Sequence, residues 1–214
     1  MSLIGKPLKR REDWRFLGGS GNFVDDVKLP NTAWIAFVRS PHAHARILGI
    51  DASAAQGIPG VLRVLTAADW KSAGLGELTC VHPMPFSDGR PMNEVLRPCF
   101  AVDVVQHVGD VVAAVVAEDR YAALDAVDAL EVDYEILPAH TSTEHALDPG
   151  VAVLHPRFGS NLVNEVVRGD RVATRKAFAE AKHVTELSLN SNRVAGNPLE
   201  PRAYLASHER ATGH

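Results

Sequence analysis

The stretch Val111–Ile136, V-V-A-A-V-V-A-E-D-R-Y-A-A-L-D-A-V-D-A-L-E-V-D-Y-E-I, carries the clearest local architecture of the chain. Its first seven residues are all apolar, which is typical of a strand covered on both faces. Asp119 can cap a helix over Arg120–Ala129, whose predicted apolar face comprises Ala123, Leu124, Val127 and Leu130. Strict alternation then predicts a strand in which the side chains of Leu130, Val132, Tyr134 and Ile136 share one face. We therefore expect a βαβ-type unit with a right-handed crossover.

Shorter elements precede this unit. The residue pattern predicts strands over Thr32–Arg39, Ala45–Ile50 and Val61–Leu65, with a turn at Pro59-Gly60. Asp51 can cap a short helix over Ala52–Gln56. Thr66 and Asp69 form a T-x-x-D start for a helix through Lys71. The expected fold class is therefore mixed, α/β or α+β.

Residues 74–98 are rich in Gly, Pro and polar residues and show little periodicity. A loop of this length is typical of a lid, a binding loop or a subunit contact. A domain boundary is predicted within 148–156. Beyond it, Asp170 can cap a helix over Arg171–Lys182, and strands are predicted at Val184–Leu189 and Arg202–Ser207. This piece is too small for a core of its own and looks incomplete.

Composition excludes several classes of function. The apolar fraction of 46% and the charged fraction of 22% are those of an ordinary globular protein. The net charge of −4 argues against nucleic-acid binding. No apolar run is long enough for a transmembrane helix, and no h-region follows the basic residues Lys6–Arg11, so we expect no membrane association and no secretory signal.

Two cysteines, Cys80 and Cys99, are present without any C-x-x-C motif. Iron–sulfur and zinc-ribbon sites are therefore excluded by ligand count. We expect two buried, reduced thiols in a cytoplasmic protein; a disulfide is the alternative. Neither cysteine is supported as a nucleophile by more than its residue type.

The segment Phe37–Arg46, F-V-R-S-P-H-A-H-A-R, is more specific than strand and turn chemistry requires. In an extended chain His42 and His44 would point to the same side. Two readings follow. The histidines could share a metal with Asp25-Asp26 or His82, or the segment could lie at an inter-domain or inter-chain surface fixed by Arg39 and Arg46. We favour the surface.

Other motifs point to structure. Gly18-Gly19-Ser20-Gly21 matches neither a phosphate loop nor G-x-G-x-x-G, and predicts a tight turn. No G-x-S-x-G elbow is present, so Ser40 beside His42 is interpreted as a turn serine. We therefore predict no catalytic, cofactor-binding or metal-binding residue in this chain.

Three stretches together resemble a known family. They are R-R-E-D-W-R-F-L-G-G-S-G-N-F-V-D-D (10–26), F-V-R-S-P-H-A-H-A-R (37–46) and V-G-D-V-V-A-A-V-V-A-E-D-R-Y-A-A-L-D-A (108–126). The chain resembles the a/b hammerhead domain of the molybdenum-binding large subunit in the xanthine dehydrogenase, aldehyde oxidase and carbon monoxide dehydrogenase family. The tail N-P-L-E-P-R-A-Y-L-A (197–206) resembles the opening of the next, molybdopterin-binding domain.

The resemblance implies an N-terminal arm (1–18), a hammerhead domain (19–150) and an incomplete start of the molybdopterin-binding domain (151–214). In this family a molybdenum centre held by a pterin hydroxylates carbon, and electrons leave through iron–sulfur and FAD partners. The family's glutamine, glycine-rich pterin stretch and glutamate base have no counterpart here. Glu200 matches a position near the substrate region, although a structural carboxylate that caps Arg202 or local backbone is the favoured role.

The expected function is therefore structural. The chain would be a truncated or split part of the large subunit, inactive alone, partnered by the remainder of that subunit, an iron–sulfur small subunit and a FAD medium subunit. The alternative is a free-standing module that uses residues 74–98 to bind a ligand or a protein. We also expect that another polypeptide completes the strand predicted at Arg202–Ser207, before the turn at 209–213.

Overall fold

The computed structural model describes residues 3–192, 194–198, 200–209 and 211–213. They group into two compact units. One comprises Asn31–His183, and the other comprises Met1–Pro30 with Val184–His214. The first unit therefore continues past the boundary predicted within 148–156, while the division into an arm and two domains stays a prediction.

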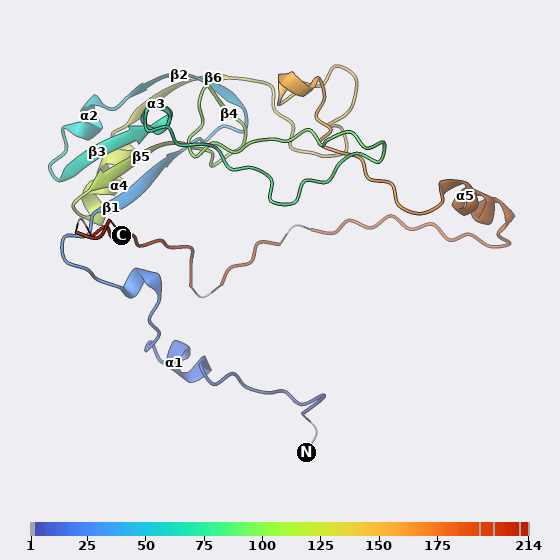
Figure 1. Ribbon diagram of the computed structural model, residues 1–214, viewed down its shortest axis with the longest axis horizontal. Helices are drawn as coiled ribbons and strands as arrows, with labels where there is room; N and C mark the ends of the chain where they lie inside the picture. The colour runs from blue at the N-terminus through green and yellow to red at the C-terminus, as the bar shows by residue number, and fades with distance from the viewer. Residues whose placement is uncertain (1–2, 193, 199, 210, 214) are drawn as a thin grey trace. The chain divides into compact units, whose positions relative to one another are not determined.

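A three-stranded sheet, here called sheet A, contains the predicted central strand. Its order is β1 (Trp34–Arg39), β5 (Val111–Ala117) and β3 (Val61–Thr66), and both pairings are antiparallel (Figure 1). Strand β5 is the central strand and is buried at five of its seven positions, where its side chains pack against α2, α4 and sheet B. The prediction of a covered strand over Val111–Ala117 is confirmed.

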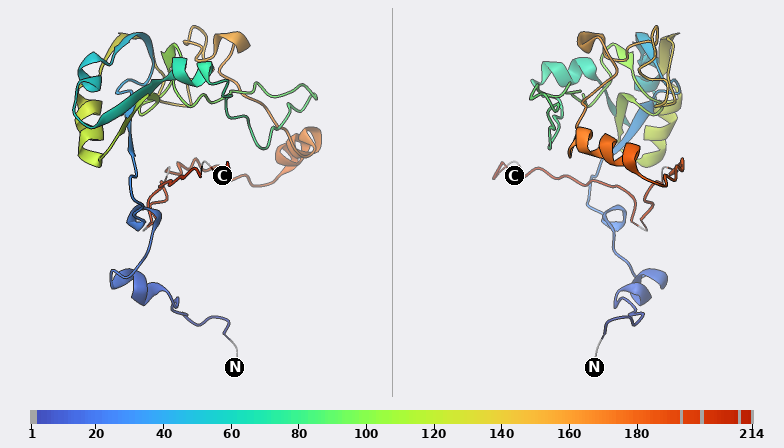
Figure 2. Two further views of the ribbon diagram at one scale, coloured as in Figure 1. Left: turned by 60° about the vertical axis from the view of Figure 1, so that its left-hand side comes forward. Right: turned by 90° about the vertical axis from the view of Figure 1, so that its right-hand side faces the viewer.

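The second sheet, sheet B, has the order β4 (Val104–Val105), β2 (Ala45–Asp51) and β6 (Glu131–Ile136), again antiparallel. Strands β5 and β6 therefore lie in different sheets (Figures 1 and 2), and the predicted βαβ unit with a right-handed crossover is wrong. A run that is apolar at every position indicates burial on both faces, but it does not distinguish parallel from antiparallel neighbours. The mixed α/β fold class is confirmed.

Local capping signals were reliable. In α4 (Arg120–Asp128), the Asp119 carboxylate accepts hydrogen bonds from the backbone of Tyr121 and Ala122, as predicted. In α3 (Ala67–Ser72), the Asp69 carboxylate accepts from the Thr66 backbone and hydroxyl. Asp51 accepts from the Ser53 backbone at the start of α2 (Ser53–Gln56), and Gly60 turns the chain with φ +86°.

The predicted apolar face of α4 is partly wrong. Its buried residues are Ala122, Ala123 and Ala126, whereas the Leu124 side chain is 45% exposed. Ala122 and Ala123 pack with Ala117 of β5, so small side chains bring the helix close to the sheet. The alternation along β6 holds through Tyr134 and fails at Ile136, which is exposed.

The core lies between the inner face of sheet A and the helices. Val38, Val64 and Val115 from the three strands pack with Ala55 of α2 and Ala126 of α4. Ile50 and Val132 of sheet B border this cluster and also a second one, which contains Ala45, Val105 and Val112. The two sheets thus share one continuous apolar region.

Residues 84–94 of the long loop are bound to residues 157–167. Ser87 N and Asn93 N donate to the carbonyl oxygens of Glu165 and Val163 at 3.0 and 2.8 Å, and Asn93 Nδ2 donates to Leu162 O at 2.7 Å. Nearby, an isolated bridge joins Leu78 to Arg97. The long loop is therefore an ordered part of the first unit, which also contains η2 (Pro156–Phe158) and α5 (Arg171–Glu180).

Helix α5 confirms the helix predicted from Asp170, whose carboxylate caps it through Val172 N and Ala173 N. The predicted strands at Val184–Leu189 and Arg202–Ser207 are wrong, because neither range forms a strand. Alternation alone does not make a strand without a neighbour to bond, and Leu187, Leu189 and Tyr204 are largely exposed. The expected completion of a terminal strand therefore loses its premise.

In the other unit, α1 (Asp13–Leu17) and η1 (Val24–Asp26) are joined by the predicted tight turn, in which Gly19 has φ +72°. The rings of Phe16 and Phe23 stack across this turn at 5.4 Å. Within the described part of the chain, no helix is long and apolar enough to cross a bilayer.

Candidate functional site

The connection between β1 and β2 contains Ser40, His42 and His44. Ser40 is 2% exposed, and its hydroxyl accepts from His42 N at 3.0 Å and donates to His42 O at 2.9 Å. Its backbone N–H donates to Asp110 O, and its carbonyl accepts from Gly109 N. Because every polar group of Ser40 is engaged in the turn, this serine is structural, as predicted.

The two histidines do not form the pair expected of an extended chain, since residues 41–44 are bent. His44 Nδ1 lies 2.7 Å from Pro138 O, so this nitrogen carries a proton and donates. The His42 ring instead contacts Tyr134 edge-on, with ring centroids 5.0 Å apart. Their partners are therefore a carbonyl and a phenol ring.

The proposed third ligands add no metal site. Asp26 accepts from Phe23 N at 2.9 Å inside η1, and His82 lies exposed in the irregular segment after Leu78. Among the described residues, no three His, Cys, Asp or Glu side chains are arranged to hold a metal ion. Cys80 and Cys99 are free, as predicted, but both are exposed, so the expectation of buried thiols is wrong.

Arg39 and Arg46 flank the segment and bind in different ways. Arg46 pairs with Glu135 across β2 and β6, and both side chains are about half exposed. Arg39 donates to Gly109 O at 2.9 Å, and its guanidinium carbon lies 5.5 Å from the centroid of the Phe37 ring. Both arginines therefore hold fixed positions at the surface.

A polar network that the sequence analysis missed lies beside this segment. Gln106 Nε2 lies 3.2 Å from His155 Nδ1, and Gln106 N donates to the Asp110 carboxylate at 3.0 Å. Burial lowers the pKa of His155, and the charges of Arg157 and His44 add to this effect. A neutral His155 can accept from the Gln106 amide. No local pattern marked His155, because its partner lies 49 residues earlier in the chain.

Tyr134 lies on the side of β6 that the alternation assigns to Leu130 and Val132, and it is half-buried. Burial raises the pKa of its phenol, which also interacts with Ser40. A neutral phenol, a neutral imidazole and a bonded serine hold the loops against the end of sheet B.

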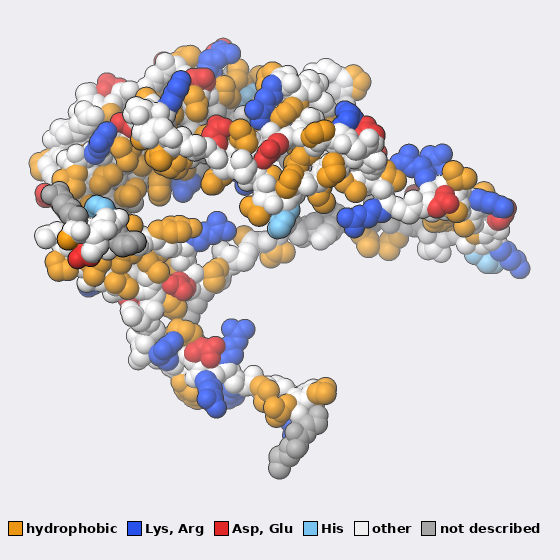
Figure 3. All heavy atoms as spheres, viewed as in Figure 1, with side chains coloured by type: hydrophobic (Ala, Val, Ile, Leu, Met, Phe, Trp, Pro, Cys, Tyr) orange, Lys and Arg blue, Asp and Glu red, His pale blue; other side chains and the backbone are white. Residues whose placement is uncertain are grey.

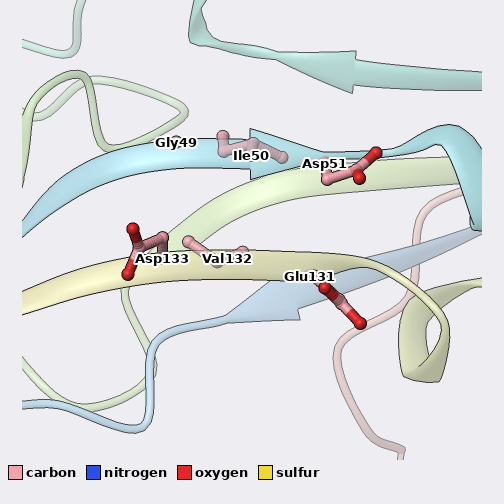
Figure 4. A pocket seen from close by; sticks show the side chains of 6 residues that line it. All are labelled: Gly49, Ile50, Asp51, Glu131, Val132 and Asp133. Carbon is pink, nitrogen blue, oxygen red and sulfur yellow. The ribbon is translucent and has the colours of Figure 1, made fainter.

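A surface pocket lies on sheet B where β2 is irregular near Gly49. It is lined by Gly49, Ile50, Asp51, Glu131, Val132 and Asp133. Figure 4 shows the three carboxylates pointing in different directions. A side-chain hydrogen bond from Ser53 lowers the pKa of Asp51, which is thus already engaged. The pocket therefore does not bring its acids together on one ion.

Glu200 has a structural contact, although a different one from that expected. Its Oε1 accepts from Val24 N at 3.2 Å, so it joins residues 176 positions apart in sequence within the second unit. The predicted partners were Arg202 and local backbone. The sequence around Glu200, between Pro198 and Pro201, gives no local sign of this distant contact.

Comparisons with known proteins agree with this mixed α/β fold. A model of the family "Aldehyde oxidase and xanthine dehydrogenase, a/b hammerhead domain" matches residues 18–138. The carbon monoxide dehydrogenase large chain of Afipia carboxidovorans is 39% identical over 98% of this chain and 26% of its own length. The nicotine 6-hydroxylase large subunit of Paenarthrobacter nicotinovorans is 36% identical over 97% of this chain and 24% of its own.

Solved structures agree. The Cu,Mo-CO dehydrogenase in its carbon monoxide reduced state gives a TM-score of 0.64 at 39% identity, over 84% of this chain and 23% of that chain. Quinoline 2-oxidoreductase from Pseudomonas putida 86 gives a TM-score of 0.61 at 38% identity, over 75% of this chain and 20% of that chain. The chain spans about a quarter of the length of these two curated relatives, the carbon monoxide dehydrogenase large chain and the nicotine 6-hydroxylase large subunit. It belongs to the aldehyde oxidase and xanthine dehydrogenase family, and residues 18–138 match the a/b hammerhead domain of that family.

Proposed function

We propose that the chain forms the N-terminal part of the large subunit of a molybdenum hydroxylase, and that its role there is to support structure and subunit contacts. The observation that carries the proposal is the pair of coverage values. Nearly all of this chain matches the carbon monoxide dehydrogenase large chain, but only 26% of that protein is accounted for. The metal-site residues would lie in the part of a large subunit beyond this match.

The described residues give no support to a molybdenum-cofactor site within this chain. No group of three potential ligands occurs among them, and no buried side-chain N or O atom lacks a hydrogen-bond partner there. A cofactor site would need polar groups free to bind the pterin or the metal. Here the candidates are occupied, Ser40 by the turn and His44 by Pro138 O.

The partners follow from the same proposal. They are the remainder of the large subunit, an iron–sulfur small subunit and a FAD medium subunit. Relatives are named as a large chain, a large subunit and a subunit of a dehydrogenase complex, which supports a multi-subunit assembly. The two free cysteines suit a reducing compartment such as the cytoplasm.

The alternative of a free-standing module with a mobile lid is not favoured. Residues 84–94 are held by backbone and side-chain hydrogen bonds to residues 157–167, and Phe86 in this segment is buried at 7% exposure. A lid would need to separate from its support. Residues 84–94 of this loop are instead bonded to residues 157–167.

Metal analysis of the purified chain tests the proposal. The chain is produced alone in a host that makes the molybdenum cofactor, and molybdenum and pterin fluorescence are measured after gel filtration. We expect neither above background, and no hydroxylase activity. Stoichiometric molybdenum that stays with the chain would contradict the proposal.

A further inference from the structure

The outer face of sheet A is apolar and exposed. Antiparallel register places Phe37, Ala114 and Leu65 in one row across the three strands. The next row contains Ile35 and Val116, with Arg63 at its end. The alternate residues of the same strands face the core. In Figure 3, hydrophobic side chains gather over the region where these strands lie in Figure 1.

Exposure on this face is high for apolar side chains. Ile35 is 58% exposed and Phe37 is 45% exposed. Single exposed apolar residues are ordinary, but contiguous ones mark a contact surface. Ala114, between Phe37 and Leu65, is only 2% exposed, so its larger neighbours form one continuous apolar surface.

A fixed cation lies at the edge of this surface. Arg39 is held by Gly109 O and lies over the Phe37 ring. No carboxylate within 4 Å pairs with Arg39 among the described residues, whereas Arg63 pairs with Asp69 at 3.1 Å. An apolar surface bordered by a pre-positioned, unpaired guanidinium complements a partner that presents apolar side chains beside a carboxylate.

We propose that this face binds a segment of the large-subunit polypeptide that lies beyond the matched region, and that the segment contacts Ile35, Phe37 and Leu65 and places a carboxylate on Arg39. The inference rests on the proposed function. About three quarters of the length of the carbon monoxide dehydrogenase large chain lies outside the match. That is ample polypeptide to cover the face, and a permanent contact explains its apolar character.

Photo-crosslinking within the native assembly tests the inference. The assembly is purified through a tag on this chain, with Phe37→benzoylphenylalanine in one sample and Tyr121→benzoylphenylalanine in a matched control. Tyr121 is an aromatic residue on α4 with 78% exposure. We expect crosslinks from position 37 to peptides of the molybdenum-bearing large-subunit polypeptide, and few from position 121.

Arginine variants test the carboxylate. Arg39→Gln should lower the crosslink yield from position 37, measured at limiting partner concentration, by about tenfold, since a charge-assisted hydrogen bond is lost. Arg39→Lys should retain part of the yield, and Arg63→Gln should leave it unchanged because Asp69 already pairs with that arginine. An unchanged yield in Arg39→Gln would remove the carboxylate from the inference.

Each remaining outcome is decisive. Crosslinks from position 37 only to the iron–sulfur subunit, to the flavin subunit or to a second copy of this chain overturn the inference. So does an assembly that contains molybdenum but gives no crosslink from position 37. If no molybdenum-containing assembly forms at all, the proposed function itself is wrong. That outcome is distinct from failure of the inference about the outer face of sheet A, in which the assembly forms but position 37 gives no crosslink to the large subunit.

Discussion

Replacing Asn161 by alanine should loosen residues 146–161 and release the long loop at 84–94. Asn161 is partly buried, and its side chain makes three hydrogen bonds. Oδ1 accepts from Leu154 N at 2.8 Å, and Nδ2 donates to the carbonyl oxygens of Ala146 and Ala152, each at 3.0 Å. The side chain thus organises the segment that then binds Asn93.

The magnitude follows from these contacts. A hydrogen bond contributes about 0.5–1.5 kcal/mol net, so three lost bonds cost about 2–4 kcal/mol of local stability. At about 1.4 kcal/mol per tenfold, the opening equilibrium should rise roughly 30- to 700-fold. Asn164→Ala is the matched control, because Asn164 donates a single bond, to Met84 O at 3.1 Å.

Hydrogen exchange with mass spectrometry is the assay. Amides within 84–94 and 146–161 should exchange much faster in Asn161→Ala, while peptides from Val111–Ala117 should be unchanged because that strand lies in the core. Asn164→Ala should produce a much smaller change. Equal protection in Asn161→Ala and the unmodified chain would refute the view that this loop is held in place.

Two further predictions concern stability. Asp119→Ala should lower the free energy of unfolding by about 1 kcal/mol in denaturant titration, since it removes the cap of α4, which packs on the core. Asp170→Ala removes an equivalent cap from α5, which has no buried residue, and should leave the core transition unchanged; equal effects would contradict this account. Because the pKa of His155 is lowered in the folded chain, its contribution is fully present above the unfolded value of 6.5 and is lost as pH falls through the lower folded pKa. Thermal midpoints should therefore fall less below pH 6.5 in His155→Phe than in the exposed control His140→Phe, and parallel curves would refute the assignment.

Local signals allowed accurate predictions of several elements. The apolar run Val111–Ala117 and the cap at Asp119 were recognised because each depends on neighbours within a few residues. The pairing of β5 with β1 and β3 depends on contacts far apart in sequence, so the βαβ prediction failed. Residues 184–189 have the alternation of a strand, yet no neighbouring strand pairs with them in the described structure.

The candidate site likewise contains features set by neighbouring residues, which were predicted, and features set by distant contacts, which were not. Ser40 was correctly interpreted as a turn residue, because Ser-Pro is a local turn signal. The bend at 41–44 separated His42 from His44, which the assumption of an extended chain could not anticipate. Hydrogen bonds such as Asn93 to Leu162 join residues 69 positions apart and leave no periodic trace. Such contacts become visible only in three dimensions.

The composition of the native assembly tests the central claim most directly. A tagged form of this chain is purified from its own cells under native conditions, and molybdenum, iron and flavin are measured per chain. The same measurement is then repeated on the chain after it has been separated from its partners. We predict that all three are stoichiometric in the intact assembly and that none stays with the separated chain. A chain that purifies alone, or one that keeps molybdenum after separation, would contradict the account.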